Sequence, residues 1–315
     1  GFDFSPDSRV LAVCRTDAAV HLYDLATGGE ASRWPTNVVP SYVAFSPDGR
    51  QLAACSGGRS STVPIWDVDA ASAVTELSVG ASTIEHLAWH PNGKELALGL
   101  SGPERAEIWD VPSQRRVAIL EGHPGRVTSV SFHPSGDLLV TGSWDGSTRL
   151  WETETARQVV LLPRGLEFAP WSRDGRIVGA QRTGGTMQLF ELDSGQEYRT
   201  FASSLGAGQG GVCNGSFSRD GRLLAVGMED GVRLWDFASG RELARLGLDI
   251  VKTPFFHPNS RELLTCGPNG LLRWPLERDR AETGPTMRVG PPHNVPMDLV
   301  PLCGTSDAAG RAFAV

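Results

Sequence analysis

Four residues in one stretch of this chain carry side chains that could take part in chemistry: His123, Thr141, Asp145 and Trp151. An imidazole, a hydroxyl, a carboxylate and an indole N–H can form a hydrogen-bonded chain, which stabilises a protein interior only when every member is satisfied. The same His, Asp and Thr types could also form a nucleophilic triad. The network uses all four residues, whereas the triad leaves Trp151 without a role. We therefore favour the network and predict no catalytic residue.

Three short strands must position these residues, and we expect them at 127–132, 138–142 and 148–151. The segment His133–Gly136 is a Pro/Gly turn, and Asp145-Gly146 is typical of a tight hairpin. The imidazole then precedes the first strand, the hydroxyl lies in the second, and the indole ends the third.

The same pattern recurs along the whole chain. Two markers keep one period: a turn such as Ser46–Gly49 after each first strand, and an aromatic residue at the end of each third strand. The aromatic residues are 39 to 45 residues apart, at Tyr23, Trp66, Trp109, Trp151, Phe190, Trp235 and Trp274. A more polar fourth strand follows each of them, as expected of an edge strand. Two markers in phase over seven copies indicate a repeat protein.

The repeat resembles that of the WD40 family. Gly122-His123 followed by Trp151-Glu152 is similar to the Gly-His and Trp-Asp signature of the family, whose period is about 40–45 residues. The resemblance implies an all-β, seven-bladed WD40-type β-propeller with four antiparallel strands per blade. It also implies that His123, Thr141, Asp145 and Trp151 form a structural tetrad. The predicted propeller covers 1–296, with repeats at about 1–35, 40–78, 84–120, 126–162, 166–201, 212–246 and 251–289.

The later repeats depart from the pattern. Repeat five has Phe190 in place of Trp, and Thr183–Gly185 where an Asp is expected. Repeat seven is expected to take its outer strand from Met287–Val289, directly downstream in the chain. Residues 305–315 echo 218–226, so 297–315 is predicted to be the truncated start of an eighth repeat or of a second propeller, with a first strand at Leu299–Leu302.

Composition and motifs argue against several classes of function. A net charge of −7 argues against general affinity for nucleic acid or anionic membranes, and no apolar run approaches the ~18 residues of a membrane span. Gly206–Gly211 fits a dinucleotide motif by letter but precedes a strand instead of a helix, so we predict no cofactor. His90, His133 and His257 share a repeat position that is Ser elsewhere, so we predict no metal. The five cysteines lie in apolar strand patterns and are expected to be buried, reduced thiols.

Trp144 lies at the tip of a loop between second and third strands, outside the repeat pattern. In WD40 proteins these loops share one face with the loops that precede the first strands, and that face often binds partners. An exposed Trp is a typical anchor of an interface. Trp144 and Arg126 are therefore the candidate contacts for a protein or peptide partner, and local packing of Trp144 is the alternative.

The sequence predicts a non-catalytic protein-interaction scaffold, expected to be a cytoplasmic segment of a larger protein. Residues 273–292 are similar to the junction in tandem-propeller regions of large bacterial proteins, which often follow a serine/threonine kinase domain. One alternative is thus a regulatory or sensor region of such a kinase. The other is a propeller enzyme with a site at the mouth of the central channel, but its candidate residues are scattered over the first strands at Asp3, Glu85, His86, Glu167 and Lys252.

Overall fold

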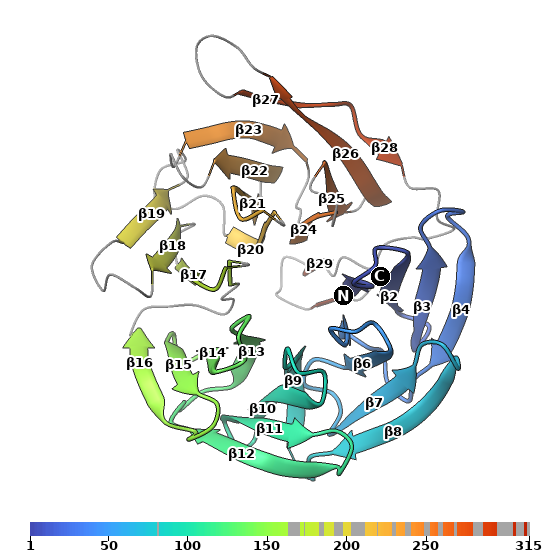
Figure 1. The fold of residues 1–315 in the computed structure, drawn as a ribbon, viewed down its shortest axis with the longest axis vertical. Coiled ribbons are helices and arrows are strands. Elements are labelled where there is room, and N and C mark those ends of the chain that lie inside the picture. Colours follow the sequence, from blue (N-terminus) through green and yellow to red (C-terminus); the bar gives the residue numbers. More distant parts are fainter. Residues whose placement is uncertain are drawn as a thin grey trace. The chain divides into compact units, whose positions relative to one another are not determined.

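A computed structural model describes residues 1–80, 82–162, 171–172, 174–182, 186–191, 198–202, 212–218, 220–228, 231–236, 241–248, 253–257, 261–267, 270–279, 286–294, 305–306 and 312–313. Every regular element in these residues is a β-strand, and Figure 1 shows the strands grouped into small sheets. None of the elements that the structure describes is a helix long and apolar enough to cross a membrane. The chain divides into two compact units, Gly1–Trp171 and Ser172–Val315, and no sheet contains strands of both.

The first unit contains four antiparallel sheets, each built from four consecutive strands and called a blade below. Blades one and two are β1 (Phe2–Phe4), β2 (Val10–Arg15), β3 (Ala19–Asp24), β4 (Glu30–Pro35), β5 (Tyr42–Phe45), β6 (Gln51–Cys55), β7 (Thr62–Asp67) and β8 (Ser72–Ser78). Blades three and four are β9 (Thr83–Trp89), β10 (Glu95–Ser101), β11 (Arg105–Asp110), β12 (Arg115–Glu121), β13 (Val127–Phe132), β14 (Leu138–Ser143), β15 (Thr148–Glu152) and β16 (Gln158–Leu162). The three strands predicted in 122–151 are confirmed to within one residue at each end.

Side-chain hydrogen bonds close the turn that the sequence marks after each first strand. In blade two, the Ser46 hydroxyl donates to Asp48 over 2.6 Å and accepts from the backbone N–H of Gln51 over 2.9 Å. Asp48 also accepts from the N–H of Arg50, while Gly49 takes a left-handed φ of 74° that costs glycine little. Ser5 and Asp7 make the same contacts in blade one. These local bonds explain why the turn could be predicted from sequence.

The core of the first unit lies between blades, because each sheet is apolar on both faces. In β6, Leu52 and Ala54 belong to a cluster shared with blade one, whereas the alternate residues Ala53 and Cys55 belong to a cluster shared with blade three. A third cluster joins blades three and four. First strands of successive blades are also in contact, β1 with β5, β5 with β9 and β9 with β13. This is the packing of a β-propeller.

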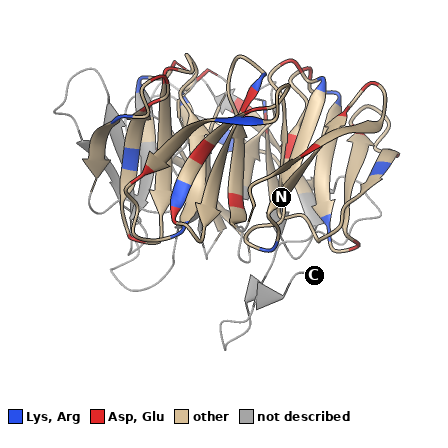
Figure 2. Cartoon of the chain, turned by 90° about the horizontal axis from the view of Figure 1, so that it is seen from below, with Lys and Arg blue, Asp and Glu red and all other residues tan. Residues whose placement is uncertain are grey.

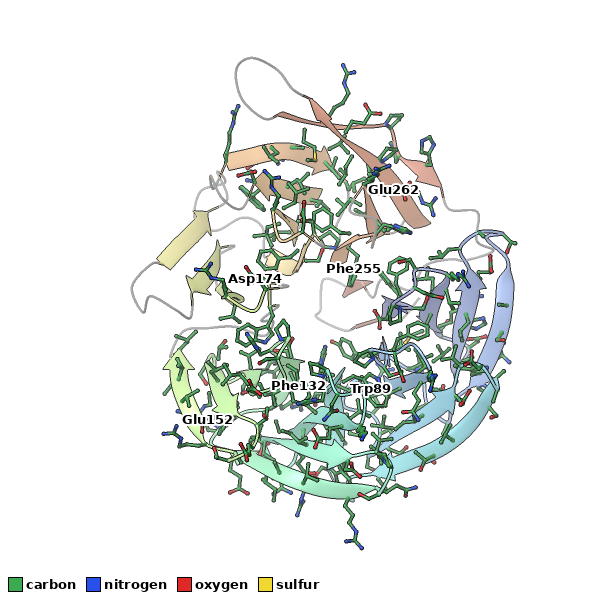
Figure 3. All side chains as sticks on the ribbon, in the orientation of Figure 1. Trp89, Phe132, Glu152, Asp174, Phe255 and Glu262 are labelled. Atoms are coloured by element: carbon green, nitrogen blue, oxygen red, sulfur yellow. The ribbon has the colours of Figure 1, made fainter. Side chains whose placement is uncertain are left out.

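Two tryptophans, Trp89 at the end of β9 and Trp171, bond to the preceding blade. The indole N–H of Trp89 donates to the carbonyl of Ala44 over 3.0 Å, and that of Trp171 donates to the carbonyl of Ser131 over 3.1 Å. Figure 3 labels Trp89 and Phe132, the residues at the ends of the first strands of blades three and four. Trp89 is 8% exposed and lies in the cluster between blades two and three. Its hydrogen bond adds a polar link to that packing.

Asp3 makes a further polar link between blades one and two. Its carboxylate accepts the backbone N–H of Phe4 over 2.9 Å and that of Phe45, in β5, over 2.8 Å. Burial raises the pKa of Asp3 to about 7, although both backbone hydrogen bonds act in the opposite direction. The cost of burying the charge therefore exceeds the gain from the two donors.

The second unit continues the pattern with less regular sheets. Its strands are β17 (Ile177–Arg182), β18 (Thr186–Glu191), β19 (Tyr198–Ala202), β20 (Val212–Phe217), β21 (Leu223–Met228), β22 (Gly231–Asp236), β23 (Arg241–Gly247), β24 (Thr253–Phe256), β25 (Glu262–Gly267), β26 (Gly270–Asp279), β27 (Thr286–Val289), β28 (His293–Asn294), β29 (Thr305–Ser306) and β30 (Ala312–Phe313). The blade β20–β23 shares a core cluster with the sheet β24–β28. As predicted, β27 is the outer strand and pairs with β26. The short strand β28, which the sequence did not predict, pairs with β26 at Leu272 and Arg273.

The number of complete blades differs from the prediction. Among the described residues, six sheets have at least four strands, not seven, and β17–β19 form a sheet of three strands. The three-stranded sheet falls in repeat five, where Phe190 replaces Trp and the second hairpin has no Asp. The strand expected to open this repeat, and the predicted strand Leu299–Leu302, lie outside the described residues. The hairpin of β29 and β30 lies within 297–315.

Asp3→Asn should change how stability depends on pH. A carboxyl group whose pKa is raised by folding binds a proton in the native state that the unfolded chain lacks, so stability falls as pH rises from about 4 to about 7 and then levels off. Burial lowers the pKa of His86 to about 4 and acts in the opposite direction, equally in both proteins. The difference in Tm, native minus D3N, should therefore decrease across this window in melts followed by circular dichroism. A difference independent of pH would contradict the raised pKa.

Candidate tetrad and exposed loop face of blade four

The four residues predicted as a network are hydrogen-bonded to one another in blade four. The indole N–H of Trp151 donates to Thr141 Oγ1 over 2.9 Å, and Thr141 Oγ1 lies 2.7 Å from His123 Nε2. His123 Nδ1 in turn lies 2.7 Å from Asp145 Oδ2. All of these side chains are buried or nearly so. The sheet positions them, because Thr141 is in β14, Trp151 is in β15 and Asp145 is in the turn between these strands.

The direction of each hydrogen bond follows from the chemistry of the groups. An indole N–H can only donate, so the Thr141 oxygen accepts from it and donates its own hydrogen to His123 Nε2. The protonated Nδ1 of a neutral imidazole then donates to the Asp145 carboxylate. Burial and the charge of Arg149 together lower the pKa of His123 more than Asp145 raises it, which favours this neutral form. Burial alone would raise the pKa of Asp145, but hydrogen bonds from Ser147 and His123 outweigh burial and lower it.

Two serines complete the network and were missed by the sequence analysis. The backbone N–H of Ser147 donates to Asp145 Oδ1 over 2.6 Å, and the Ser147 hydroxyl lies 3.3 Å from His123 Nδ1. The Ser143 hydroxyl donates to the carbonyl of Gly125 over 2.9 Å and accepts the N–H of Asp145 over 3.1 Å. The sequence did contain a signal for the role of Ser147. An Asp such as Asp145 often accepts the backbone N–H of the residue two positions later, which forms an Asx turn.

Gly122 has a backbone conformation that other residues rarely adopt. Its φ is 147°, and a Cβ at this position would clash with the guanidinium of Arg149 and approach the ring of Trp151. Glycine adopts this φ at little cost, whereas a residue with a Cβ would be strained there. The Gly-His pair of the sequence motif therefore has a steric basis as well as a polar one.

Other blades satisfy the third-strand Trp with different partners. In blade three, the indole N–H of Trp109 donates to the buried Glu107 over 2.8 Å, and this carboxylate also accepts from Arg105 and Arg116. In the second unit, Trp274 donates to Thr265 Oγ1 over 2.9 Å. The hydrogen bond between a Trp and a Thr hydroxyl thus recurs in this sheet, for which the sequence predicts no His equivalent to His123.

The loop beside the tetrad holds Trp144 in an exposed position. The backbone N–H of Trp144 donates to the carbonyl of Arg126 over 3.0 Å, and the Arg126 guanidinium lies 4.9 Å from the indole ring centroid. Arg126 also lies 3.7 Å from Glu85 of blade three. Trp144 is nevertheless 61% exposed. The loop before β13 and the loop after β14 are thus joined into one face, called the Trp144 face, which consists of residues 123–126 and 143–147.

His90 and His133, two of the histidines considered as metal ligands, have local partners. His90 Nε2 lies 3.1 Å from the Gly136 carbonyl, and His133 Nδ1 lies 2.6 Å from Ser135. No group of three or more metal-ligating side chains occurs in the part of the chain that the structure describes. Cys14 and Cys55 are buried free thiols, and burial raises the pKa of Cys55 to about 12. The candidate residues Glu167 and Lys252, and the Gly206–Gly211 segment, lie outside the described residues.

Comparison with known proteins supports the WD40 resemblance. Residues 36–67 and 114–152 match the WD40 family model, described as WD domain, G-beta repeat. The chain is 30% identical over 118 residues to a guanine nucleotide-binding protein subunit beta of Arabidopsis thaliana, covering 35% of this chain and 30% of that protein. It is 35% identical over 86 residues to WD repeat-containing protein 1 of Xenopus tropicalis, covering 26% of this chain and 14% of the other. It is also 28% identical over 139 residues to telomerase protein component 1 of Mus musculus, covering 42% of this chain and 5% of that protein. The chain spans less than a third of the length of each of these relatives.

Thr141→Val should destabilise the protein more than Thr265→Val. The first change leaves both the Trp151 N–H and His123 Nε2 without partners, whereas the second removes the one hydrogen bond to Trp274. Each buried polar group left unpaired costs about 1–3 kcal/mol. Urea unfolding should therefore show a larger loss of free energy of unfolding for T141V, by about the cost of one such group. Equal losses would contradict a stabilising role for the His123–Thr141 bond.

Proposed function

We propose that this segment is a non-catalytic scaffold that binds a protein or peptide through the Trp144 face. The observation that carries the proposal is a large aromatic side chain, 61% exposed, on a loop that hydrogen bonds hold in place. An exposed, preorganised Trp buries much surface on binding and loses little conformational entropy, so it suits an interface anchor. The similarity to a protein named as a subunit of a guanine nucleotide-binding protein supports a binding role.

The chemistry around Trp144 indicates the kind of partner. The ring is covered on one side by the Arg126 guanidinium, which is itself about half exposed, and Glu85 is the acidic neighbour of that guanidinium. An apolar partner residue can pack on the indole while a partner carboxylate pairs with Arg126 in competition with Glu85. We infer that the partner presents an apolar side chain next to an acidic one.

The alternative functions gain no specific support from the described residues. Asp3 bonds to backbone N–H groups, Glu85 lies beside Arg126, and the His86 ring lies 4.6 Å from the Tyr42 ring. Each of these side chains thus has a different partner among the described residues. A kinase domain elsewhere in a longer bacterial protein is a proposal based on sequence resemblance alone, and a cytoplasmic location is a proposal based on the reduced cysteines expected from the sequence.

Basic and acidic positions are interspersed over the strands and turns of the described residues in Figure 2. The proposed recognition therefore rests on one aromatic anchor and its adjacent charges, and not on a broad patch of one sign. Mixed surface charge of this kind gives little general attraction to polyanions.

Trp144→Ala tests the proposal, and Val117→Ala is its control. Val117 is 53% exposed on the outer strand β12, away from the Trp144 face, so it controls for the loss of an exposed apolar side chain. Affinity capture from cells of the source organism should recover a partner with the native segment and with V117A, and lose it with W144A. Melting temperatures should agree among all three proteins. Retention of every partner by W144A, at unchanged stability, would exclude this face.

A further inference from the structure

A cavity of about 240 Å³ lies beside blade two, within the first unit. It is bounded by the segment 35–40, which connects β4 to β5, and by β6, β7 and the outer strand β8 (Figure 1). The lining residues Pro35, Asn37 and Glu76 are exposed, so the cavity opens to solvent beside them. No residue of the Trp144 face lines the cavity, which is therefore separate from the proposed partner contact.

The cavity lies where the sheet of blade two is incompletely paired. β6 and β7 pair at three positions, which end at Ala53 and Ile65, whereas the corresponding strands of blades three and four each pair at five. Pro64 comes next in β7 and has no N–H to donate across the sheet. The loop after β6 is held by blade three instead, because the N–H of Gly58 donates to the carbonyl of Ile84 over 2.7 Å. The two strands therefore separate beside the cavity.

Accessible apolar side chains line the cavity from both the connection and the blade. Pro35 and Val38 come from the connection, and Pro64 and Val74 come from β7 and β8. Val74 is 52% exposed, Pro35 is exposed, and Val38 and Pro64 are half-buried. A ligand with an apolar body removes part of this surface from water, which favours binding.

Two accessible polar side chains of the lining can only accept hydrogen bonds from a ligand. The exposed Glu76 carboxylate has no hydrogen to donate. The half-buried Thr36 hydroxyl already donates its hydrogen to the carbonyl of Val38 over 2.9 Å, so its remaining capacity is that of an acceptor. The exposed Asn37 adds an amide oxygen. A ligand with several N–H donors matches these groups.

The charge of the lining favours a cation. Glu76 is the acidic residue of the lining, which includes no Lys, Arg or His. A positively charged ligand therefore meets a carboxylate and no competing cation of the lining. A carboxylate or phosphate would lose hydration without gaining a countercharge. The net charge of −7 adds a general attraction for cations that a test must separate from the site itself.

We propose that this cavity binds a small primary amine with an apolar body. A protonated primary amine has three N–H donors and no acceptor. The ammonium group pairs with Glu76, with Thr36 as a further acceptor, and the apolar body packs against Val38, Pro64 and Val74. The cavity is smaller than the ~300–1,000 Å³ typical of drug-sized ligands, so the body has one ring or a comparable aliphatic group.

2-Phenylethylamine is the probe, and 2-phenylethanol, of the same shape but uncharged, is its matched control. Titration of the complete ¹⁵N-labelled segment at neutral pH and low ionic strength should give saturable shifts of the amide signals of Thr36, Thr62 and Thr75. The amine should bind about two- to fivefold more tightly than the alcohol, the range expected for one exposed ion pair. Equal affinity of the two probes, or no saturable shift at these residues up to the solubility limit, would overturn the proposal.

A lysine derivative distinguishes a free amine from a side chain of a partner protein. Nα-acetyl-lysine amide presents the same ammonium group on a narrow aliphatic stem. It should bind more weakly than 2-phenylethylamine, because the stem covers less of the apolar lining than a ring does. Tighter binding of the lysine derivative would indicate that the cavity takes a Lys side chain, and it would overturn the assignment to a small amine.

Two variants test the charged and the apolar part of the site. Glu76→Gln should remove the preference for the amine over the alcohol and leave the affinity for 2-phenylethanol unchanged. Val74→Ala should weaken the binding of both probes by about two- to threefold, because it removes apolar contact surface. Glu121→Gln and Val117→Ala are the matched controls, since both residues are exposed on the outer strand β12 and do not line the cavity.

The controls separate the site from a general attraction between a cation and an acidic protein. E121Q should keep the preference for the amine, and V117A should keep both affinities. All four variants should melt at the native temperature, because exposed positions contribute little to stability. An unchanged preference in E76Q would overturn the proposal. So would an equal loss of the preference in E76Q and E121Q.

Discussion

The structure of the first unit depends on apolar packing between the faces of successive sheets. Each blade presents one set of alternate residues to the blade before it and the other set to the blade after it. Leu52 and Ala53 are adjacent in sequence and both are fully buried, yet they belong to different clusters. Every strand in the middle of a blade must therefore be apolar at successive positions, with small residues where the sheets approach closely. The polar contacts of the molecule act within this frame.

The tetrad of blade four is one solution to a need shared by the blades whose third strand ends in Trp. A Trp at the end of a third strand fills the space between sheets, and its indole N–H needs an acceptor. Blade four uses Thr141 and extends the chain of bonds to the turn, blade three uses the charged Glu107, and the sheet β24–β28 uses Thr265. The group that accepts the indole N–H thus differs among the blades, whereas the Trp ring fills the same position between the sheets. This is consistent with the tetrad as a local reinforcement, in a fold held mainly by the interfaces between sheets.

The features that could be predicted from sequence are those set by residues close together in the chain. The Ser-Pro-Asp-Gly turn is closed by its own side chains, and the strands on either side of it were located to within a residue in blade four. The hydrogen bonds of His123, Thr141, Asp145 and Trp151 connect residues of one repeat. Contacts to a neighbouring blade, such as Trp89 to Ala44 or Asp3 to Phe45, carry no such local signal. The predicted number of complete blades was wrong: repeat five keeps both markers that the prediction counted, at Asp174 and Phe190, yet its described strands form a sheet of three.

The claim that sheet-to-sheet packing holds the first unit is tested most directly by double-mutant cycles. Ile65 and Leu98 are fully buried in the cluster between blades two and three, whereas Leu139 belongs to the cluster between blades three and four. Free energies of unfolding would be measured for Ile65→Ala, Leu98→Ala, Leu139→Ala and the double variants. The account predicts a coupling of about 0.5–3 kcal/mol for I65A with L98A, and additivity to within about 0.5 kcal/mol for L98A with L139A. Additive losses in the first pair, together with strong coupling in the second, would contradict it.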